Sequence, residues 1–128
     1  MTILLDTHVV FWIAEDSPKL SKNSRDLLVD PRNKKFVSIA SAWEVAIKLG
    51  RDDFQLEGGL GEFFRIITGN DYLILPIKEQ HLSFVPILPK IHRDPFDRLL
   101  IATTIAEKMT IMTIDENIHK YNVDFVWL

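Results

Sequence analysis

The acidic residues of most chemical interest stand at junctions between predicted strands and predicted helices. Four carboxylates have this position: Asp6, Glu44, Asp97 and Asp115. In a chain without cysteine and without histidines at metal-ligand spacing, carboxylate oxygens favour a hard cation such as Mg²⁺ or Mn²⁺. Such a cation can activate water and neutralise the charge that develops on a phosphodiester during in-line displacement. The residue types therefore predict metal-dependent phosphodiester hydrolysis, provided that the fold brings them together.

The elements that must position these acids follow from an alternation of apolar segments and helical patterns. Strands are predicted at residues 3–5, 36–39, 72–77, 111–114 and 124–128. Helices are predicted at residues 7–14, 21–28, 41–50, 60–67 and 78–85, with a long helix from about residue 95. This alternation predicts an α/β fold with a parallel sheet of about five strands and helices on both faces, in one domain of 128 residues.

The predicted topology places the acids at one edge of the sheet. In such sheets, ligands bind outside the carboxyl ends of the strands. Asp6 and Asp115 follow the first and fourth strands, and Glu44 lies in the first turn of the helix after the second strand. Asp97 begins the helix that returns antiparallel to the fourth strand, so its first turn is expected near the same edge.

Each acid also has a structural interpretation, which is that it caps a helix. Ser41 and Glu44 form a capping box in which the glutamate would bond back to the serine amide. Asp94 is predicted as the N-cap of the helix that starts at Pro95, with Asp97 facing the positive end of the dipole. The acids that follow strands could likewise cap the next helix. Capping explains each acid alone, but four carboxylates at one edge would repel unless a cation held them.

Composition sets limits on the class of protein. At 47% apolar and 26% charged residues the chain has ordinary globular composition. Its formal net charge of -3 argues against a polycationic nucleic-acid binder, but not against an enzyme that reaches phosphates through a cation. The absence of cysteine excludes disulfides and thiolate catalysis. No apolar run approaches the roughly 20 residues of a membrane span, and no signal peptide is evident, so a cytoplasmic protein is expected.

Four motifs, taken in order, resemble one known family. They are LLDTHVVFW (4–12), SAWEVAIK (41–48), HRDPFDRLLIA (92–102) and TID (113–115). Together they resemble the PIN domain, and most closely the VapC-type toxin ribonucleases of bacterial toxin–antitoxin pairs. The resemblance runs from residue 3 to about residue 120. It implies a three-layer α/β/α sandwich and a catalytic, metal-binding set formed by Asp6, Glu44, Asp97 and Asp115.

The same resemblance implies partners and a reaction. The expected activity is a Mg²⁺-dependent endoribonuclease, with Mn²⁺ as a substitute, acting on RNA with one or two ions. A small antitoxin protein is expected to block the acidic groove, and the family commonly forms homodimers.

Side chains next to the acids are candidates for supporting roles: Thr7, Ser41, Thr113 and Asp94. The threonine hydroxyls can orient a carboxylate or a metal-bound water, or make only local turn bonds. Arg98 and His8 are weaker candidates for substrate contact, since Arg98 is expected to face solvent or pair with an acid. Structural or surface roles are favoured for the four histidines: His8, His81, His92 and His119.

Other functions fit the residues less well than the nuclease does. A phosphotransfer hydrolase with Asp6 as nucleophile usually has a second acid two residues on, where this chain has His8. A receiver-like module needs an aspartate at the end of the third strand, and residues 72–79 contain none. A PIN-like scaffold that only binds RNA or protein remains an alternative. The nuclease is the preferred prediction.

Overall fold

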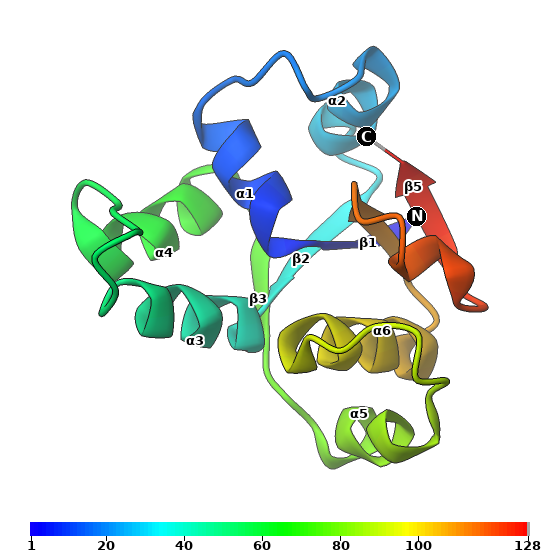
Figure 1. The fold of residues 1–128 in the computed structure, drawn as a ribbon. Coiled ribbons are helices and arrows are strands. Elements are labelled where there is room, and N and C mark those ends of the chain that lie inside the picture. Colours follow the sequence, from blue (N-terminus) through cyan, green and yellow to red (C-terminus); the bar gives the residue numbers. More distant parts are fainter. Residues whose placement is uncertain (128) are drawn as a thin grey trace.

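The chain folds as an α/β/α sandwich around a central sheet (Figure 1). We describe residues 1–127 of a computed structural model. The sheet has five strands in the order β3-β2-β1-β4-β5, and all neighbouring pairs are parallel. The strands are β1 (Thr2–Leu5), β2 (Lys34–Ser38), β3 (Leu73–Leu75), β4 (Thr110–Thr113) and β5 (Asp124–Trp127). The predicted parallel sheet of about five strands is confirmed.

Helices cover both faces of this sheet in residues 1–127 (Figure 1). They are α1 (Thr7–Ala14), α2 (Lys22–Val29), α3 (Ile39–Lys48), α4 (Gly59–Gly69), α5 (Glu79–Phe84) and α6 (Pro95–Glu107). Two short 3₁₀ turns are η1 (Val85–Ile87) and η2 (Ile118–Lys120). None of the helices in the described residues is long and apolar enough to cross a membrane.

The central strand β1 explains why the sheet separates two apolar cores. Ile3 and Leu5 point to the core that α1 to α4 cover, whereas Leu4 points to the core beneath α6. All three side chains are fully buried. Because successive side chains of a strand face opposite sides, a strand buried on both faces reads as a continuous apolar run. This is the pattern by which the sequence marks β1.

The strand order places a topological switch point between β1 and β4. The chain moves from β1 outward through β2 to β3, and then crosses back to place β4 on the other side of β1. The carboxyl ends of two adjacent strands are therefore followed by connections that diverge to opposite sides, which is where ligands bind in open parallel sheets. Asp6 follows β1 at this point, and its amide continues the ladder by donating to Met112 O at 3.0 Å.

The structure corrects the predicted start of α3. The helix begins at Ile39, and the Ser38 hydroxyl caps it by accepting from the Ala40 amide at 3.0 Å. The predicted capping box of Ser41 and Glu44 is therefore wrong, because both residues lie inside a helix that has already started. The third strand is also shorter than predicted. It ends before Pro76, which has no amide for the sheet. Residue 128, at the end of the predicted fifth strand, lies outside the described residues.

Candidate metal centre

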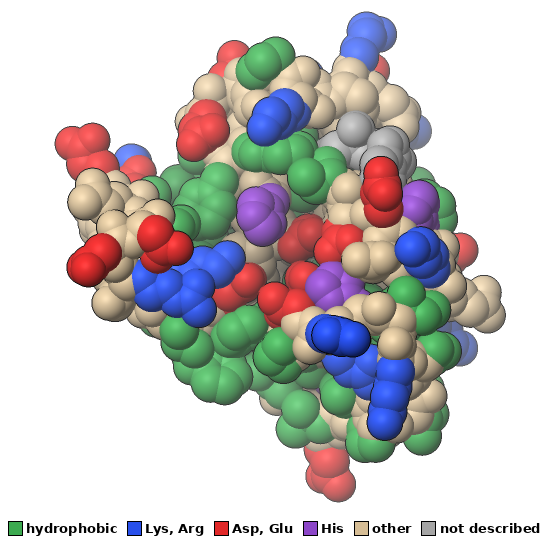
Figure 2. Space-filling view, viewed as in Figure 1, with side chains coloured by type: hydrophobic (Ala, Val, Ile, Leu, Met, Phe, Trp, Pro, Cys, Tyr) green, Lys and Arg blue, Asp and Glu red, His purple; other side chains and the backbone are tan. Residues whose placement is uncertain are grey.

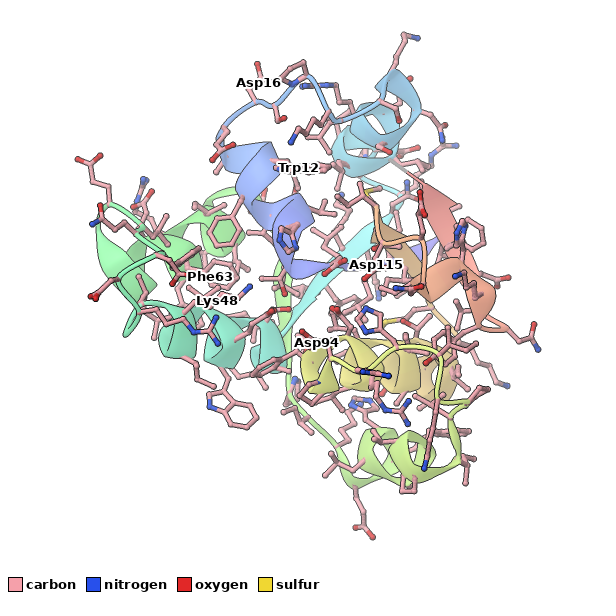
Figure 3. The ribbon with its side chains drawn as sticks, viewed as in Figure 1. Trp12, Asp16, Lys48, Phe63, Asp94 and Asp115 are labelled. Atoms are coloured by element: carbon pink, nitrogen blue, oxygen red, sulfur yellow. The ribbon has the colours of Figure 1, made fainter. Side chains whose placement is uncertain are left out.

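Acidic side chains gather at the centre of one face of the molecule, where the carboxyl ends of β1 and β4 meet (Figure 2). Two acids and one lysine mark this region in the stick view (Figure 3). Asp94 lies at the start of α6, Asp115 lies after β4, and Lys48 lies at the end of α3. Segments far apart in the sequence therefore contribute to one region.

Asp6 is buried at the end of β1, with 4% of its surface exposed. Its Oδ2 accepts a hydrogen bond from Thr113 Oγ1 at 2.8 Å. It occupies the N-cap position of α1 but makes no side-chain capping bond, so capping does not account for it. Burial raises the pKa of Asp6, and the bond from Thr113 opposes that rise. The side-chain partner of this buried carboxylate thus comes from the neighbouring strand β4.

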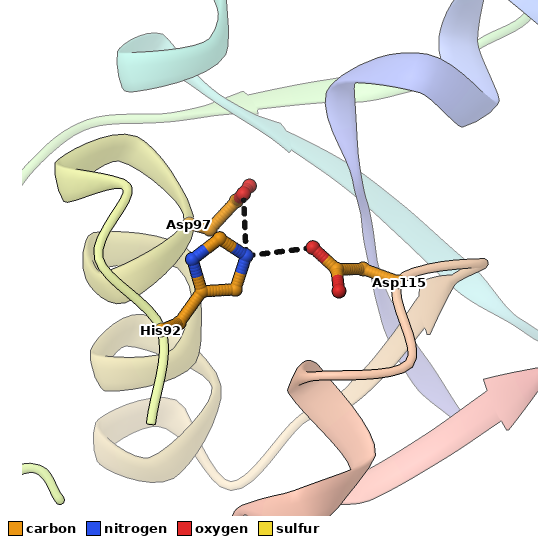
Figure 4. A group of neighbouring side chains, drawn as sticks. All are labelled: His92, Asp97 and Asp115. Atoms are coloured by element: carbon orange, nitrogen blue, oxygen red, sulfur yellow. Dashed lines mark hydrogen bonds and ion pairs between the residues drawn. The ribbon is translucent and has the colours of Figure 1, made fainter. Parts of the chain in front are cut away.

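Asp97 and Asp115 converge on the imidazole of His92 (Figure 4). His92 Nε2 lies 2.7 Å from Asp115 Oδ2 and 3.0 Å from Asp97 Oδ2. One ligand atom from each of the three residues lies within 4.8 Å of the other two. All three side chains are half-buried. This spacing is compatible with a single shared cation.

The environment of His92 indicates how its ring contributes. The Asp94 amide donates to His92 Nδ1 at 3.1 Å, so Nδ1 is the acceptor nitrogen. In the neutral ring the proton is then on Nε2, which faces the two carboxylates, Asp97 and Asp115. His92 therefore acts as a donor that holds the acids together. Carboxylate oxygens remain the natural ligands of a hard cation at this centre.

Asp94 has the capping role predicted for it. Its Oδ1 accepts from the amides of Phe96, at 2.8 Å, and Asp97, at 3.2 Å. The cap fixes the first turn of α6 and hence the position of the Asp97 side chain. Since the Asp94 amide also holds the His92 ring, this residue supports the centre through the backbone of its neighbours.

Glu44 is held from both sides at the edge of the centre. Thr7 Oγ1 donates to Glu44 Oε1 at 2.8 Å and lies 2.9 Å from Ser41 Oγ. Lys48 Nζ lies 3.1 Å from Glu44 Oε2, one helical turn further along α3. Glu44 is buried, at 7% exposed, so these contacts fix its carboxylate. Thr7 and Ser41 therefore orient a predicted acid.

Thr113 links two of the acids. Its hydroxyl donates to Asp6 Oδ2 at 2.8 Å and accepts from the Asp115 amide at 3.0 Å. The Asp115 Oδ1 in turn accepts from the Asn117 amide at 2.8 Å, which leaves Oδ2 for His92. The two interpretations of Thr113, carboxylate orientation and a local turn bond, both hold.

Burial and the surrounding charges raise the pKa of Asp97 to about 7. Burial is the largest cause, followed by the negative charges of Asp6 and Asp94, while His92 acts in the opposite direction and Glu44 adds to the rise. Carboxylates arranged in this way need a proton or a cation to remain together. The residues present thus fit a divalent metal ion.

Comparison with known proteins identifies the family. The model of the PIN domain matches residues 3–124. The chain belongs to the PIN domain family. No curated protein sequence matches this PIN domain.

Solved structures agree with this assignment at the level of fold. VapBC2 from Rickettsia felis, bound to a DNA fragment from its promoter, matches with a TM-score of 0.77 and 15% identity, over 100% of this chain and 99% of that chain. VapBC-1 from nontypeable Haemophilus influenzae matches with a TM-score of 0.66 and 14% identity, over 99% of this chain and 98% of that chain. VapBC-5 from Mycobacterium tuberculosis, a toxin–antitoxin system, matches with a TM-score of 0.63 and 14% identity, over 99% of this chain and 98% of that chain.

The PIN domain brings the predicted acids to one region but not into one compact set. Asp97 and Asp115 share the compact group with His92. Asp6 and Glu44 lie outside that group, although the charge of each raises the pKa of Asp97. Asp97 thus interacts electrostatically with both Asp6 and Glu44.

The sequence analysis missed the position of His92 at this centre of the PIN domain and favoured a structural or surface role for it. A search for paired histidine spacing could not find it, because its neighbours are acids and one of them comes from the end of β4. The available signal was its place in the motif HRDPFD, just ahead of the N-cap Asp94.

The two substrate candidates have different positions. Arg98 neither faces solvent freely nor pairs with an acid, so that prediction is wrong: its guanidinium donates to Val85 O at 2.9 Å, Pro89 O at 3.1 Å and His92 O at 3.4 Å. His8 is exposed on the first turn of α1, and its charge lowers the pKa of Asp6. Geometry therefore leaves His8 available to a ligand and commits Arg98 to the loop.

Proposed function

We propose that this PIN domain is a metal-dependent endoribonuclease and the toxin of a toxin–antitoxin pair. The observation that carries the proposal is the approach of Asp97 Oδ2 and Asp115 Oδ2 to one imidazole nitrogen, at 3.0 Å and 2.7 Å. PIN domains are in general nucleases, and the family match supports that activity.

Mg²⁺, or Mn²⁺ in its place, would be held by the carboxylates of the centre: Asp6, Glu44, Asp97 and Asp115. The bound cation would supply Lewis-acid activation of water and neutralise charge on the phosphodiester. The protein's part is to keep the oxygens in place. Thr113 orients Asp6, Thr7 and Lys48 orient Glu44, and His92 spans Asp97 and Asp115.

An antitoxin partner and a homodimer belong to the same proposal, as does a cytoplasmic location. The fold likeness to chains of VapBC complexes supports the partner. Large apolar side chains are exposed on α3, where Trp43 is 59% and Ile47 42% exposed. Trp43 packs edge-on against Phe96, in the first turn of α6, so apolar surface lies next to the acidic centre.

The test is cleavage of single-stranded RNA by purified protein with Mg²⁺, with EDTA, and after Asp97→Asn. We expect cleavage that requires the metal and falls by roughly 100-fold or more in the variant. Asp26→Asn, an exposed acid of α2, is the matched control and should retain activity. Cleavage that survives both EDTA and Asp97→Asn would exclude this centre. RNA binding without any turnover would favour the scaffold alternative.

A further inference from the structure

A basic pocket lies directly beside the metal centre. It has a volume of about 450 Å³ and is lined by Lys90, His92, Arg93 and Arg98. This volume is within the roughly 300–1,000 Å³ of small-ligand sites. Its lining contains three cationic side chains and no acid. Lys and Arg side chains also flank the central acids in the space-filling view (Figure 2).

The pocket and the metal centre share a wall. His92 lines the pocket, and its Nε2 contacts Asp97 and Asp115. An anion in the pocket and a phosphodiester at the acids would therefore lie next to the same residue. Neighbouring phosphates of a single strand are adjacent in this way, because the backbone joins them. Two unconnected anions would not require adjacent sites.

Hydrogen bonds to uncharged backbone carbonyl groups hold the loop that forms the pocket. Arg98 donates to the carbonyl oxygens of Val85, Pro89 and His92. Tyr121 Oη donates to Pro89 O at 2.8 Å and accepts from the His92 amide at 2.8 Å. Because carbonyl groups do not neutralise a guanidinium, Arg98 fixes the loop and still contributes its full charge to the pocket.

The two remaining cations of the pocket, Lys90 and Arg93, have no acidic partner in the part of the chain that the structure describes. Lys90 and Arg93 are exposed, and neither side chain has a hydrogen bond or ion pair within residues 1–127. Other basic residues differ in this respect, since several are paired with acids: Lys22, Arg25, Arg32, Lys48, Arg65 and Lys78. Lys48, on the other side of the centre, is therefore already committed to Glu44. Lys90 and Arg93 thus bring unpaired positive charge to the pocket side of the centre.

The positive charge of the pocket matters for a polyanionic substrate. The chain has a net charge of -3, and its centre is acidic, so an RNA backbone is repelled except where cations compensate. Contacts to phosphates supply most sequence-independent affinity for nucleic acids. We propose that the pocket formed by Lys90, Arg93 and Arg98 binds the RNA backbone phosphate next to the scissile one. This proposal rests on the nuclease function above, and it sets the direction in which the strand leaves the centre.

The test measures binding, separately from cleavage. A fluorescent single-stranded RNA is titrated with protein in Ca²⁺ instead of Mg²⁺ at several salt concentrations, and anisotropy is read. The variant Lys90→Gln/Arg93→Gln removes two charges of the pocket. The control Lys34→Gln/Lys108→Gln removes two exposed charges next to the amino ends of β2 and β4, at the opposite edge of the sheet. Thermal melting verifies that both variants fold.

We expect the pocket variant to bind about 10-fold more weakly, with a salt slope smaller by roughly 0.7, because one backbone phosphate is no longer neutralised. The control should remain within about 2-fold of the unaltered protein. A single methylphosphonate linkage, moved along the RNA, should weaken binding at one position beside the cleaved bond. The pocket variant should be insensitive to that linkage, because it already lacks the cations that bind this phosphate.

The outcomes separate this proposal from the function on which it rests. If the unaltered protein cleaves RNA but the pocket variant binds it as tightly as the control does, the pocket assignment is overturned and the nuclease remains. If the unaltered protein neither binds nor cleaves RNA, both proposals fall.

Discussion

The hydroxyl of Thr113 donates to Asp6 Oδ2 at 2.8 Å and so joins two residues 107 positions apart, at the ends of adjacent strands. Both side chains are buried, and Asp6 has a pKa that burial raises. The bond is the main contact that favours the charged form of this carboxylate. At the carboxyl ends of β1 and β4, the hydroxyl of Thr113 therefore opposes the rise in the pKa of Asp6 that burial causes.

Thr113→Val removes this donor while keeping the shape of the side chain. The pKa of Asp6 should rise further, and both Mg²⁺ affinity and RNA cleavage should fall by about 10- to 100-fold. Stability should fall by about 1–3 kcal/mol, since a buried carboxylate loses its partner. Calorimetric titration with Mn²⁺ and urea unfolding measure the two effects.

Thr113→Ser restores the hydroxyl and should restore metal affinity. Thr103→Val is the matched control, because Thr103 is also buried but bonds only to Leu99 O within α6. If Thr113→Val binds Mn²⁺ as tightly as Thr103→Val, the hydroxyl does not support the centre.

The pKa of Asp97, about 7, predicts how stability depends on pH without metal. The folded protein retains a proton on Asp97 that the unfolded chain loses near pH 4, so stability should fall as pH rises from about 4 to 7 and then level off. A pKa shift of one unit corresponds to about 1.4 kcal/mol. We expect the free energy of unfolding to fall by about 2 kcal/mol over this range, which is half of what the full pKa shift would give. Urea unfolding in EDTA between pH 4 and 7 measures this change.

Asp97→Asn should flatten that part of the profile and stabilise the metal-free protein above pH 7. Mg²⁺ should stabilise the unaltered protein more at pH 8 than at pH 5, because the cation binds the ionised carboxylate. A metal-free profile that is unchanged by Asp97→Asn would show that another group carries the pH dependence.

The sequence was sufficient for the architecture because the relevant signals are local. Ile3 to Leu5 form a fully buried strand, and Asp94 with Pro95 starts α6 as predicted. The acids at the carboxyl edge followed from topology alone. These inferences need only periodicity and the side chains that neighbour each helix start.

The sequence was insufficient where two nearby groups compete for the same role. Ser38 and Ser41 both precede a helical pattern, and the first one caps α3, which leaves Ser41 for Thr7. Arg98 could not be assigned either, because its partners are backbone carbonyls of a loop whose path no pattern encodes. The contact of His92 with Asp115 likewise depends on how α6 docks against β4.

His92→Gln tests whether the imidazole holds the acids together. Without a donor between them, Asp97 and Asp115 should repel, and Mn²⁺ affinity and RNA cleavage should each fall by about 10- to 100-fold. His119→Gln, an exposed histidine of η2, is the control and should leave both unchanged. Calorimetry and a cleavage assay provide the measurements. Metal affinity equal in the two variants would remove His92 from the centre.

His81 provides a contrasting case, a buried histidine whose hydrogen bonds join α5 to α6. It is 1% exposed, and its Nε2 lies 2.7 Å from Glu107 Oε1, while its Nδ1 accepts from the Lys78 amide at 3.2 Å. The ring thereby ties α5 to α6, and its bond is the largest cause of the lowered pKa of Glu107.

His81→Ala leaves a cavity and removes both bonds, so unfolding free energy should fall by about 2–4 kcal/mol. Mn²⁺ affinity at the centre should stay within about 2-fold, since α6 begins at its own cap, Asp94, far along the helix from Glu107. Urea unfolding and calorimetry on the same preparation report the two quantities. The contradicting result is a loss of Mn²⁺ affinity larger than the unfolded fraction of the protein explains. It would mean that the packing of α5 on α6 positions Asp97, and that His81 supports the metal centre.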